Sequence, residues 1–134
     1  MENIEEKAIG FLQQLVRIPS LSGEEYLLAQ AVEDKLKELH FDEVWRDDLG
    51  SVVGVRKGAY PGANILFDAH MDVVPIGQMD AWKHDPFGGE LSEGKVWGRG
   101  ATDTKGSLAG MIMALGSLDP QDIHGTVSLV ASVG

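Results

Sequence analysis

The sequence predicts an α/β domain in which a mixed, partly parallel sheet is flanked by helices. Two amphipathic helical patterns open the chain, compact apolar runs suited to buried strands occur at 64–69 and 126–133, and a third helical pattern lies between these runs. A strand, a crossover helix and a second strand form a βαβ unit, in which the two strands are parallel. The length of 134 residues suits one domain.

The first predicted element is a helix over residues 4–16, where apolar side chains recur at helical spacing. Asn3 and Glu6 have the spacing of a capping box, in which each side chain accepts a hydrogen bond from the backbone N–H of the other residue. Pro19 ends the pattern, because proline cannot supply the N–H that a continuing helix needs.

A second helix and a hairpin come next. Ser22 and Glu25 repeat the capping-box spacing ahead of an amphipathic pattern over 28–39. Residues 41–47 and 51–56 have strand-like composition and are separated by an Asp-Leu-Gly turn. We therefore expect a second capped helix followed by a β-hairpin.

The apolar run 64–69 is too short for a helix and ends at His70, so we expect a strand buried on both faces. Residues 71–94 contain several glycines and prolines and predict a long loop. A loop of that length in a compact domain is more often functional than idle. The remaining predicted elements are a short strand at 95–97, a helix that begins near Lys105 and a strand over 126–133.

Composition restricts the classes of partner and chemistry. The net charge is −10 and no cluster of Lys and Arg offsets it, so we expect no nucleic-acid and no membrane partner. The absence of cysteine excludes disulfides, cysteine zinc fingers and thiol catalysis, so any metal is held by His and carboxylate. The sequence has neither a signal-peptide pattern nor an apolar run long enough to span a bilayer. A cytoplasmic location is the expectation.

A nucleotide-binding domain is a further hypothesis, because residues 89–95 match the first seven positions of a phosphate-binding P-loop. The next residue is Val96, where a P-loop needs Ser or Thr to hold magnesium. A strand-like sequence follows, whereas a P-loop opens a helix. We interpret the segment as a turn.

His70 and Asp72 lie at the carboxyl end of a predicted strand, where open α/β sheets place their ligands. Residues i and i+2 of a strand face the same side, so Asp72 can accept a hydrogen bond from a metal-binding His70. The alternative is a strand-end histidine that only bonds to its neighbour.

Asp103 stands just before a predicted helix, which is also where a capping aspartate belongs. Thr102 or Thr104 could cap the helix instead and leave Asp103 free. The βαβ unit would place Asp103 and His70 at the same edge of the sheet. A metal site requires an imidazole nitrogen of His70 and a carboxylate oxygen of Asp103 to lie about 3–4 Å apart.

Three motifs together resemble the acetylornithine deacetylase / succinyl-diaminopimelate desuccinylase family, which also contains aminoacylases and several zinc carboxy- and dipeptidases. The motifs are FDAHMDVVP at 67–75, W-x-x-D-P-F at 82–87 and GKVWGRGATDTKG at 94–106. The resemblance covers the whole chain but only about the first third of a typical member. It implies a zinc-exopeptidase-like catalytic domain.

The resemblance also implies roles for the site residues. His70 would bind one of two zinc ions, Asp72 would be the adjacent supporting acid that orients it, and Asp103 would bridge both ions. Cobalt or manganese could replace zinc. The peptide bond between Asp103 and Thr104 is expected to be cis.

The reaction that the resemblance implies is hydrolysis of amide bonds in acyl-amino acids or short peptides. In the family, a Glu-Glu pair follows the strand that here precedes Gly134; its first member is the general base and its second a metal ligand. The general base is therefore not among these residues. We expect residues 1–134 to be the N-terminal portion of the catalytic domain, without the lid domain, which mediates homodimerisation, and without the C-terminal catalytic portion.

Two ligands cannot close a zinc site that needs three protein ligands and water, so we expect this chain alone to bind zinc weakly and to hydrolyse nothing. The last strand is expected to lack its neighbours, which would leave an exposed sheet edge and favour self-association. The alternative function is a non-catalytic metal- or ligand-binding α/β module on the same scaffold.

Overall fold

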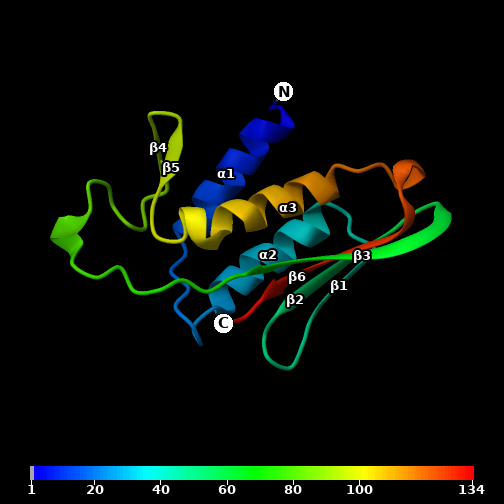
Figure 1. Ribbon diagram of the computed structural model, residues 1–134, viewed down its shortest axis with the longest axis horizontal. Helices are drawn as coiled ribbons and strands as arrows, with labels where there is room; N and C mark the ends of the chain where they lie inside the picture. Colours follow the sequence, from blue (N-terminus) through cyan, green and yellow to red (C-terminus); the bar gives the residue numbers. More distant parts are fainter. Residues whose placement is uncertain (1) are drawn as a thin grey trace.

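The computed structural model describes residues 2–134 and contains a four-stranded mixed sheet with its helices on one side (Figure 1). The strand order is β1-β2-β6-β3, in which β2 pairs antiparallel with β1 and with β6, and β3 pairs parallel with β6. The fold class predicted from the sequence is confirmed. The strands of this sheet are β1 (Glu43–Arg46), β2 (Val52–Lys57), β3 (Tyr60–His70) and β6 (His124–Ser132).

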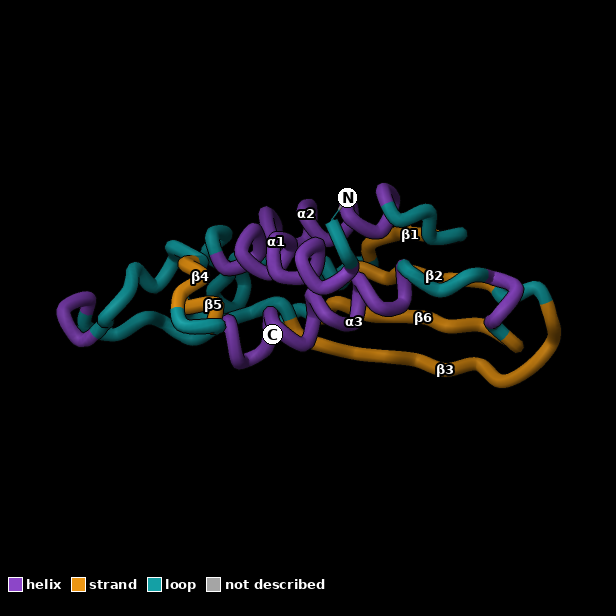
Figure 2. Tube along the Cα trace, turned by 90° about the horizontal axis from the view of Figure 1, so that it is seen from above, coloured by secondary structure: helices purple, strands orange, loops and turns teal. Residues whose placement is uncertain are grey.

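The helices are α1 (Ile4–Val16), α2 (Tyr26–Glu38) and α3 (Gly106–Gly116). Figure 2 shows α3 as the crossover between β3 and β6, so the predicted βαβ unit is present. The long loop after β3 extends away from the sheet and leads to a small hairpin of β4 (Glu90–Ser92) and β5 (Lys95–Trp97). The segment that resembles a P-loop, residues 89–95, contains β4, the turn of this hairpin and the first residue of β5, so it opens no helix, and its interpretation as a turn holds only for the two residues between the strands.

Local signals account for the start of α1 but not for that of α2. Asn3 Oδ1 accepts a hydrogen bond from the Glu6 N–H, and Glu6 Oε2 accepts one from the Asn3 N–H, which confirms the predicted capping box. The prediction of a second capping box, at Ser22 and Glu25, is wrong, because no side chain caps α2. Ser22 instead donates to Asp72, and Glu25 Oε1 accepts from the backbone N–H of Gly23.

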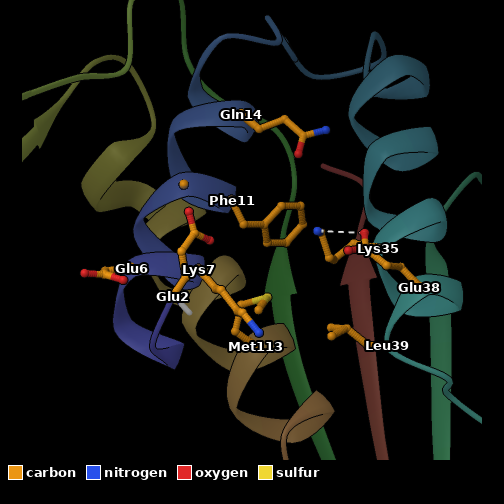
Figure 3. A pocket seen from close by; sticks show the side chains of 10 residues that line it. Glu2, Glu6, Lys7, Phe11, Gln14, Lys35, Glu38, Leu39 and Met113 are labelled. Atoms are coloured by element: carbon orange, nitrogen blue, oxygen red, sulfur yellow. Dashed lines mark hydrogen bonds and ion pairs between the residues drawn. The ribbon is translucent and has the colours of Figure 1, made fainter.

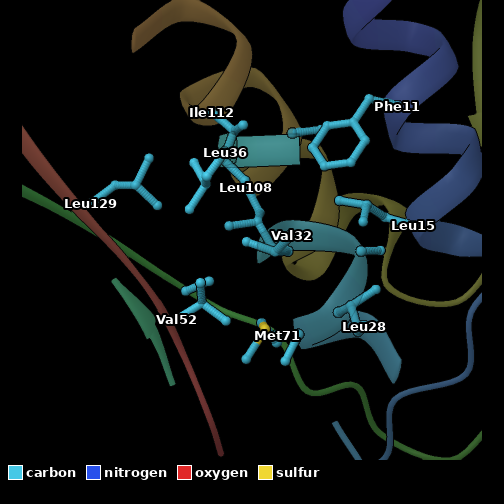
Figure 4. Close-up of a cluster of buried hydrophobic side chains, with 14 of the residues drawn as sticks. Phe11, Leu15, Leu28, Val32, Leu36, Val52, Met71, Leu108, Ile112 and Leu129 are labelled. Carbon is cyan, nitrogen blue, oxygen red and sulfur yellow. The ribbon is translucent and has the colours of Figure 1, made fainter. Parts of the chain in front are cut away.

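The core lies between the three helices and the sheet (Figure 4). It includes Met71, which directly follows β3 and has no exposed surface. Its burial anchors the chain between His70 and Asp72, so the backbone of the predicted site is fixed from beneath. The labelled core side chains in Figure 4 are Phe11, Leu15, Leu28, Val32, Leu36, Val52, Met71, Leu108, Ile112 and Leu129.

The prediction that β3 is buried on both faces is wrong. Ile65, Leu66 and Phe67 are all exposed, and Leu66 retains 64% of its accessible surface. The reason is the strand order: β3 is the last strand of the sheet and has a neighbour on one side only. The expected exposed edge therefore exists on β3, whereas the last strand in sequence, β6, lies between β2 and β3.

The segment before α3 is irregular over Ala101–Lys105, and the helix begins at Gly106, close to the predicted start. Asp103 has non-helical backbone angles, and no side chain caps the helix. The prediction that Thr102 or Thr104 caps α3 is therefore wrong. Asp103 does not cap the helix either, so its carboxylate is free for other contacts, as predicted. Along residues 2–134, no helix is both long and apolar enough to cross a membrane.

Candidate metal centre

His70 ends β3 and presents a partly exposed imidazole ring. Its Nδ1 lies 3.0 Å from the backbone oxygen of Asp72 and 3.1 Å from the carboxylate Oδ1 of the same residue. Both oxygens are acceptors, so Nδ1 carries the hydrogen and donates it to Asp72. Asp72 lies two residues beyond His70, just after the end of β3, and the buried Met71 separates them. The predicted contact between His70 and Asp72 is present.

Asp103 reaches the other ring nitrogen of His70. Its Oδ1 lies 2.9 Å from Nε2 of His70, although the two residues are 33 positions apart in sequence. The peptide bond between Asp103 and Thr104 is cis, as expected. The geometric prediction for His70 and Asp103 is thus confirmed, while their role as metal ligands stays a prediction.

The donor set fits a divalent metal ion. An imidazole nitrogen and a carboxylate oxygen are common ligands of zinc. The Asp103 side chain is 85% exposed and that of His70 is 40% exposed, so both side chains are accessible from solvent. Within residues 2–134, no group of three or more His, Asp and Glu residues is arranged to hold a metal ion. The pair therefore supplies two ligand atoms of such a site.

The acids around His70 favour its protonated form. Burial opposes protonation, but the hydrogen bond to Asp103, the backbone carbonyl of Asp72 and the negative charges of both carboxylates outweigh it, so the pKa of His70 is raised. A proton and a metal ion compete for Nε2. Metal binding at this pair therefore weakens as the pH falls.

A glycine-rich turn lies directly against the histidine strand. Gly100 has a positive φ of 85°, and a Cβ placed there would lie 2.5 Å from Cγ1 of Val73. Only a residue without a side chain fits this approach. The glycine in the GRGATD sequence thus allows the turn that carries Asp103 to pack beside the strand end that carries His70.

An open hollow of about 400 Å³ adjoins His70 and is also lined by residues including Thr104 and Ser107. A second cavity, of about 330 Å³, lies among the three helices (Figure 3), with Phe11 and Met113 in its lining. None of the site residues lines this second cavity. Of these two spaces, only the hollow beside His70 adjoins a residue of the site.

Two further residues contact the site elements, and sequence patterns did not identify them as part of the site. The spacing of Ser22 suits a helix cap, but its Oγ donates to Asp72 Oδ2 at 2.6 Å. Lys105 marks the start of a predicted helix, but it is buried and its Nζ donates to the backbone oxygens of Leu15 and Ile18. The only sequence feature that could have linked Lys105 to the site was its position within the motif that contains Asp103.

The chain belongs to peptidase family M20/M25/M40, whose family model matches residues 66–134. It is 40% identical over 111 residues to a succinyl-diaminopimelate desuccinylase of Cereibacter sphaeroides. The alignment covers 79% of this chain and 28% of the desuccinylase. The chain thus spans a little over a quarter of the length of the curated relatives that it matches.

Solved structures agree with the fold. Human carnosine dipeptidase 1 superposes with a TM-score of 0.78 at 22% identity, covering 96% of this chain and 32% of that one. The dipeptidase Dug1p of Saccharomyces cerevisiae superposes with a TM-score of 0.80 at 17% identity, and the match covers 97% of this chain and 32% of Dug1p. A dinuclear metal-binding peptidase of the M20 family from Bacillus subtilis gives 0.73 at 23% identity, covering 98% and 35%.

Proposed function

We propose that the chain is the N-terminal portion of the catalytic domain of a metal-dependent hydrolase that cleaves amide bonds in acyl-amino acids or short peptides. The observation that carries the proposal is the contact of 2.9 Å between His70 Nε2 and Asp103 Oδ1, with Asp72 behind the ring. The three residues form the carboxylate–histidine arrangement that metal sites use to orient a ligand.

The residues have distinct roles in this proposal. His70 and Asp103 would hold a zinc ion, and Asp103 would be shared with a second ion; cobalt or manganese are alternatives. Asp72 keeps the hydrogen of His70 on Nδ1, which leaves the lone pair of Nε2 for the metal. Metal ions bound in such sites polarise a carbonyl group and lower the pKa of bound water. The general base would be the first glutamate of a Glu-Glu pair beyond residue 134.

The class of substrate is supported by the relatives. The relative that is 40% identical is named as a succinyl-diaminopimelate desuccinylase, which favours an N-succinyl amino acid as the first substrate to assay. The dipeptidases among the structural neighbours share less than 25% identity and support only the fold. We further propose a cytoplasmic location and a homodimeric parent protein.

The coding sequence after residue 134 provides the first test, because the proposal requires two consecutive glutamates there. A chain extended through the complete catalytic domain should then hydrolyse N-succinyl amino acids in the presence of zinc. His70→Ala should abolish this hydrolysis, whereas His124→Ala, which changes a histidine stacked on Tyr60 at the start of β6, should not. Residues 1–134 alone should give no turnover.

Two outcomes would contradict the proposal. Metal-dependent turnover by residues 1–134 alone would refute the claim that the site needs further ligands. An extended chain that binds zinc through His70 but lacks the Glu-Glu pair would favour the alternative function, a non-catalytic metal-binding module.

A further inference from the structure

The segment that joins α1 to α2, residues 17–25, lies beside the strand end that carries His70. We refer to it as the α1–α2 connection. The Val73 N–H donates to the backbone oxygen of Ser20 at 2.8 Å, and Ser20 Oγ donates to the backbone oxygen of Met71 at 2.8 Å. Leu21 and Val73 also form an isolated parallel β-bridge. Since Ser20 is fully buried, these bonds are shielded from competition by water.

The next part of the connection contacts the acid behind the imidazole. Ser22 Oγ donates to Oδ2 of Asp72 at 2.6 Å, and Oδ1 of the same carboxylate lies 3.1 Å from Nδ1 of His70. A carboxylate bonded through one oxygen can still rotate, whereas bonds to both oxygens fix its plane. Ser22, Asp72, His70 and Asp103 thus form a continuous hydrogen-bonded row.

The end of α1 and the first part of the connection hold the other half of the site through Lys105. The Nζ of Lys105 donates to the backbone oxygens of Leu15 at 2.8 Å and Ile18 at 2.7 Å. These oxygens lie at the carboxyl end of α1, where the helix dipole favours a cation. Lys105 is only 1% exposed, and a Cβ on Gly100 would lie 3.3 Å from its Cδ, so Gly100 packs closely against the lysine side chain.

We propose that the α1–α2 connection positions the metal-binding pair: Ser22 aims Asp72 and therefore His70, and Lys105 fixes the turn that carries Asp103. Both are positioning residues, because neither contacts the ring nitrogen or the carboxylate oxygen assigned to the metal. The inference rests on the proposed function for its purpose, but the contacts themselves do not depend on a metal. It assigns a role to a segment that precedes the family motifs in the sequence.

The experiment uses the 134-residue chain labelled with ¹⁵N-histidine, in which His70→Ala identifies the resonances of His70. Zn²⁺ is titrated while the Nε2 resonance of His70 is followed by NMR. Ser22→Ala should raise the apparent Kd for Zn²⁺ by about 3- to 10-fold, less than the roughly 10- to 100-fold typical of a group bonded directly to the ligand. Ser22→Thr keeps the hydroxyl and should restore the Kd to within about twofold. Lys105→Met should also raise it.

Matched controls separate positioning from general loss of stability. Ser92→Ala changes a serine of the small hairpin, and Lys83→Met changes a lysine of the long loop. Both should leave the Kd for Zn²⁺ unchanged. Solvent exchange of the His70 Nδ1 proton, measured without metal, gives a second readout. It should accelerate in Ser22→Ala and return to the wild-type rate in Ser22→Thr. Ser22 is exposed, so its replacement is expected to preserve the fold.

The outcomes distinguish this inference from the proposed function. If Zn²⁺ shifts His70 in the wild type and equally in Ser22→Ala, with unchanged proton exchange, the positioning role is overturned. If Zn²⁺ does not shift His70 in the wild type, the two ligands of this chain do not hold the ion without those beyond residue 134, and the metal-free exchange rate alone decides whether Ser22 positions Asp72. Should Lys105→Met fail to fold, the Ser22 variants still decide the result.

Discussion

Nε2 of His70 lies 2.9 Å from Oδ1 of Asp103, and this contact joins the end of β3 to the turn that opens the crossover helix α3. The βαβ topology explains the contact. The carboxyl end of a strand and the start of the helix that follows it lie at one edge of a sheet, so residues 33 positions apart become neighbours.

The first prediction concerns protonation of His70. Asp103→Asn should lower the pKa of His70, because it removes a negative charge and the carboxylate acceptor at Nε2. NMR titration of the four histidines measures this change, with Asp80→Asn as the control for loss of an exposed acid. A His70 pKa that stays the same or rises in Asp103→Asn would contradict the account.

The raised pKa of His70 also affects stability in a defined direction. Because this pKa is raised in the folded state, the contribution of His70 to stability is fully present below the unfolded pKa and is lost as the pH rises through the folded pKa. Asp103→Asn should therefore flatten the pH dependence of the free energy of unfolding across that window. Urea unfolding at a series of pH values measures the change.

The second prediction concerns Lys105, whose pKa is lowered to about 8 by burial. The unfolded chain binds more protons than the folded chain between about pH 8 and the ordinary lysine pKa of about 10.4. The free energy of unfolding should therefore gain up to about 3 kcal/mol from this group as the pH rises through that interval, because a tenfold difference in proton affinity corresponds to about 1.4 kcal/mol.

Lys105→Met should remove this gain, whereas Lys83→Met, on the exposed loop, should retain it. The difference between the two variants in denaturant unfolding isolates the contribution of Lys105 from those of other groups that titrate in alkali. Identical pH profiles for the two variants would show that burial does not lower the Lys105 pKa.

The third prediction concerns the anchor between the site residues. Met71→Ala should lower the free energy of unfolding by about 2–5 kcal/mol, because it leaves a cavity beneath the strand end. Met79→Ala, at an exposed methionine of the long loop, should change it by less than about 0.5 kcal/mol. Equal urea midpoints for the two variants would refute the assignment of Met71 to the core.

The fourth prediction concerns the free edge of β3. Its unpaired backbone and the exposed Ile65, Leu66 and Phe67 favour self-association of the 134-residue chain. Leu66→Lys should reduce the association, because edge lysines oppose strand pairing. Leu91→Lys, at an exposed leucine of β4, is the matched control. Sedimentation velocity over a concentration series measures both, and a wild-type chain that stays monomeric at high concentration would exclude the association.

The sequence predicts the features of this fold that depend on local patterns. The capping box of Asn3 and Glu6 is a contact over three positions, and the βαβ unit follows from apolar periodicity, so both features could be predicted from the sequence. The meeting of His70 and Asp103 followed from that unit.

The errors concern contacts between distant segments. The spacing of Ser22 and Glu25 fits a cap, but the hydroxyl of Ser22 bonds to an acid 50 positions away. The apolar run in β3 fits a central strand, but its burial depends on strand order, which local sequence does not encode. Lys105 is buried because the carbonyl groups at the end of another helix accept its hydrogens, and lysine is ordinarily exposed.

The most direct test of the metal site is a Zn²⁺ titration of the ¹⁵N-histidine-labelled chain, comparing the wild type with Asp103→Asn. The account predicts that the Nε2 resonance of His70 shifts at lower Zn²⁺ concentration than those of His40, His84 and His124, and that Asp103→Asn raises the apparent Kd by about tenfold or more. Binding first at one of the other histidines, or an unchanged Kd in Asp103→Asn, would contradict the assignment of His70 and Asp103 as ligands of one ion.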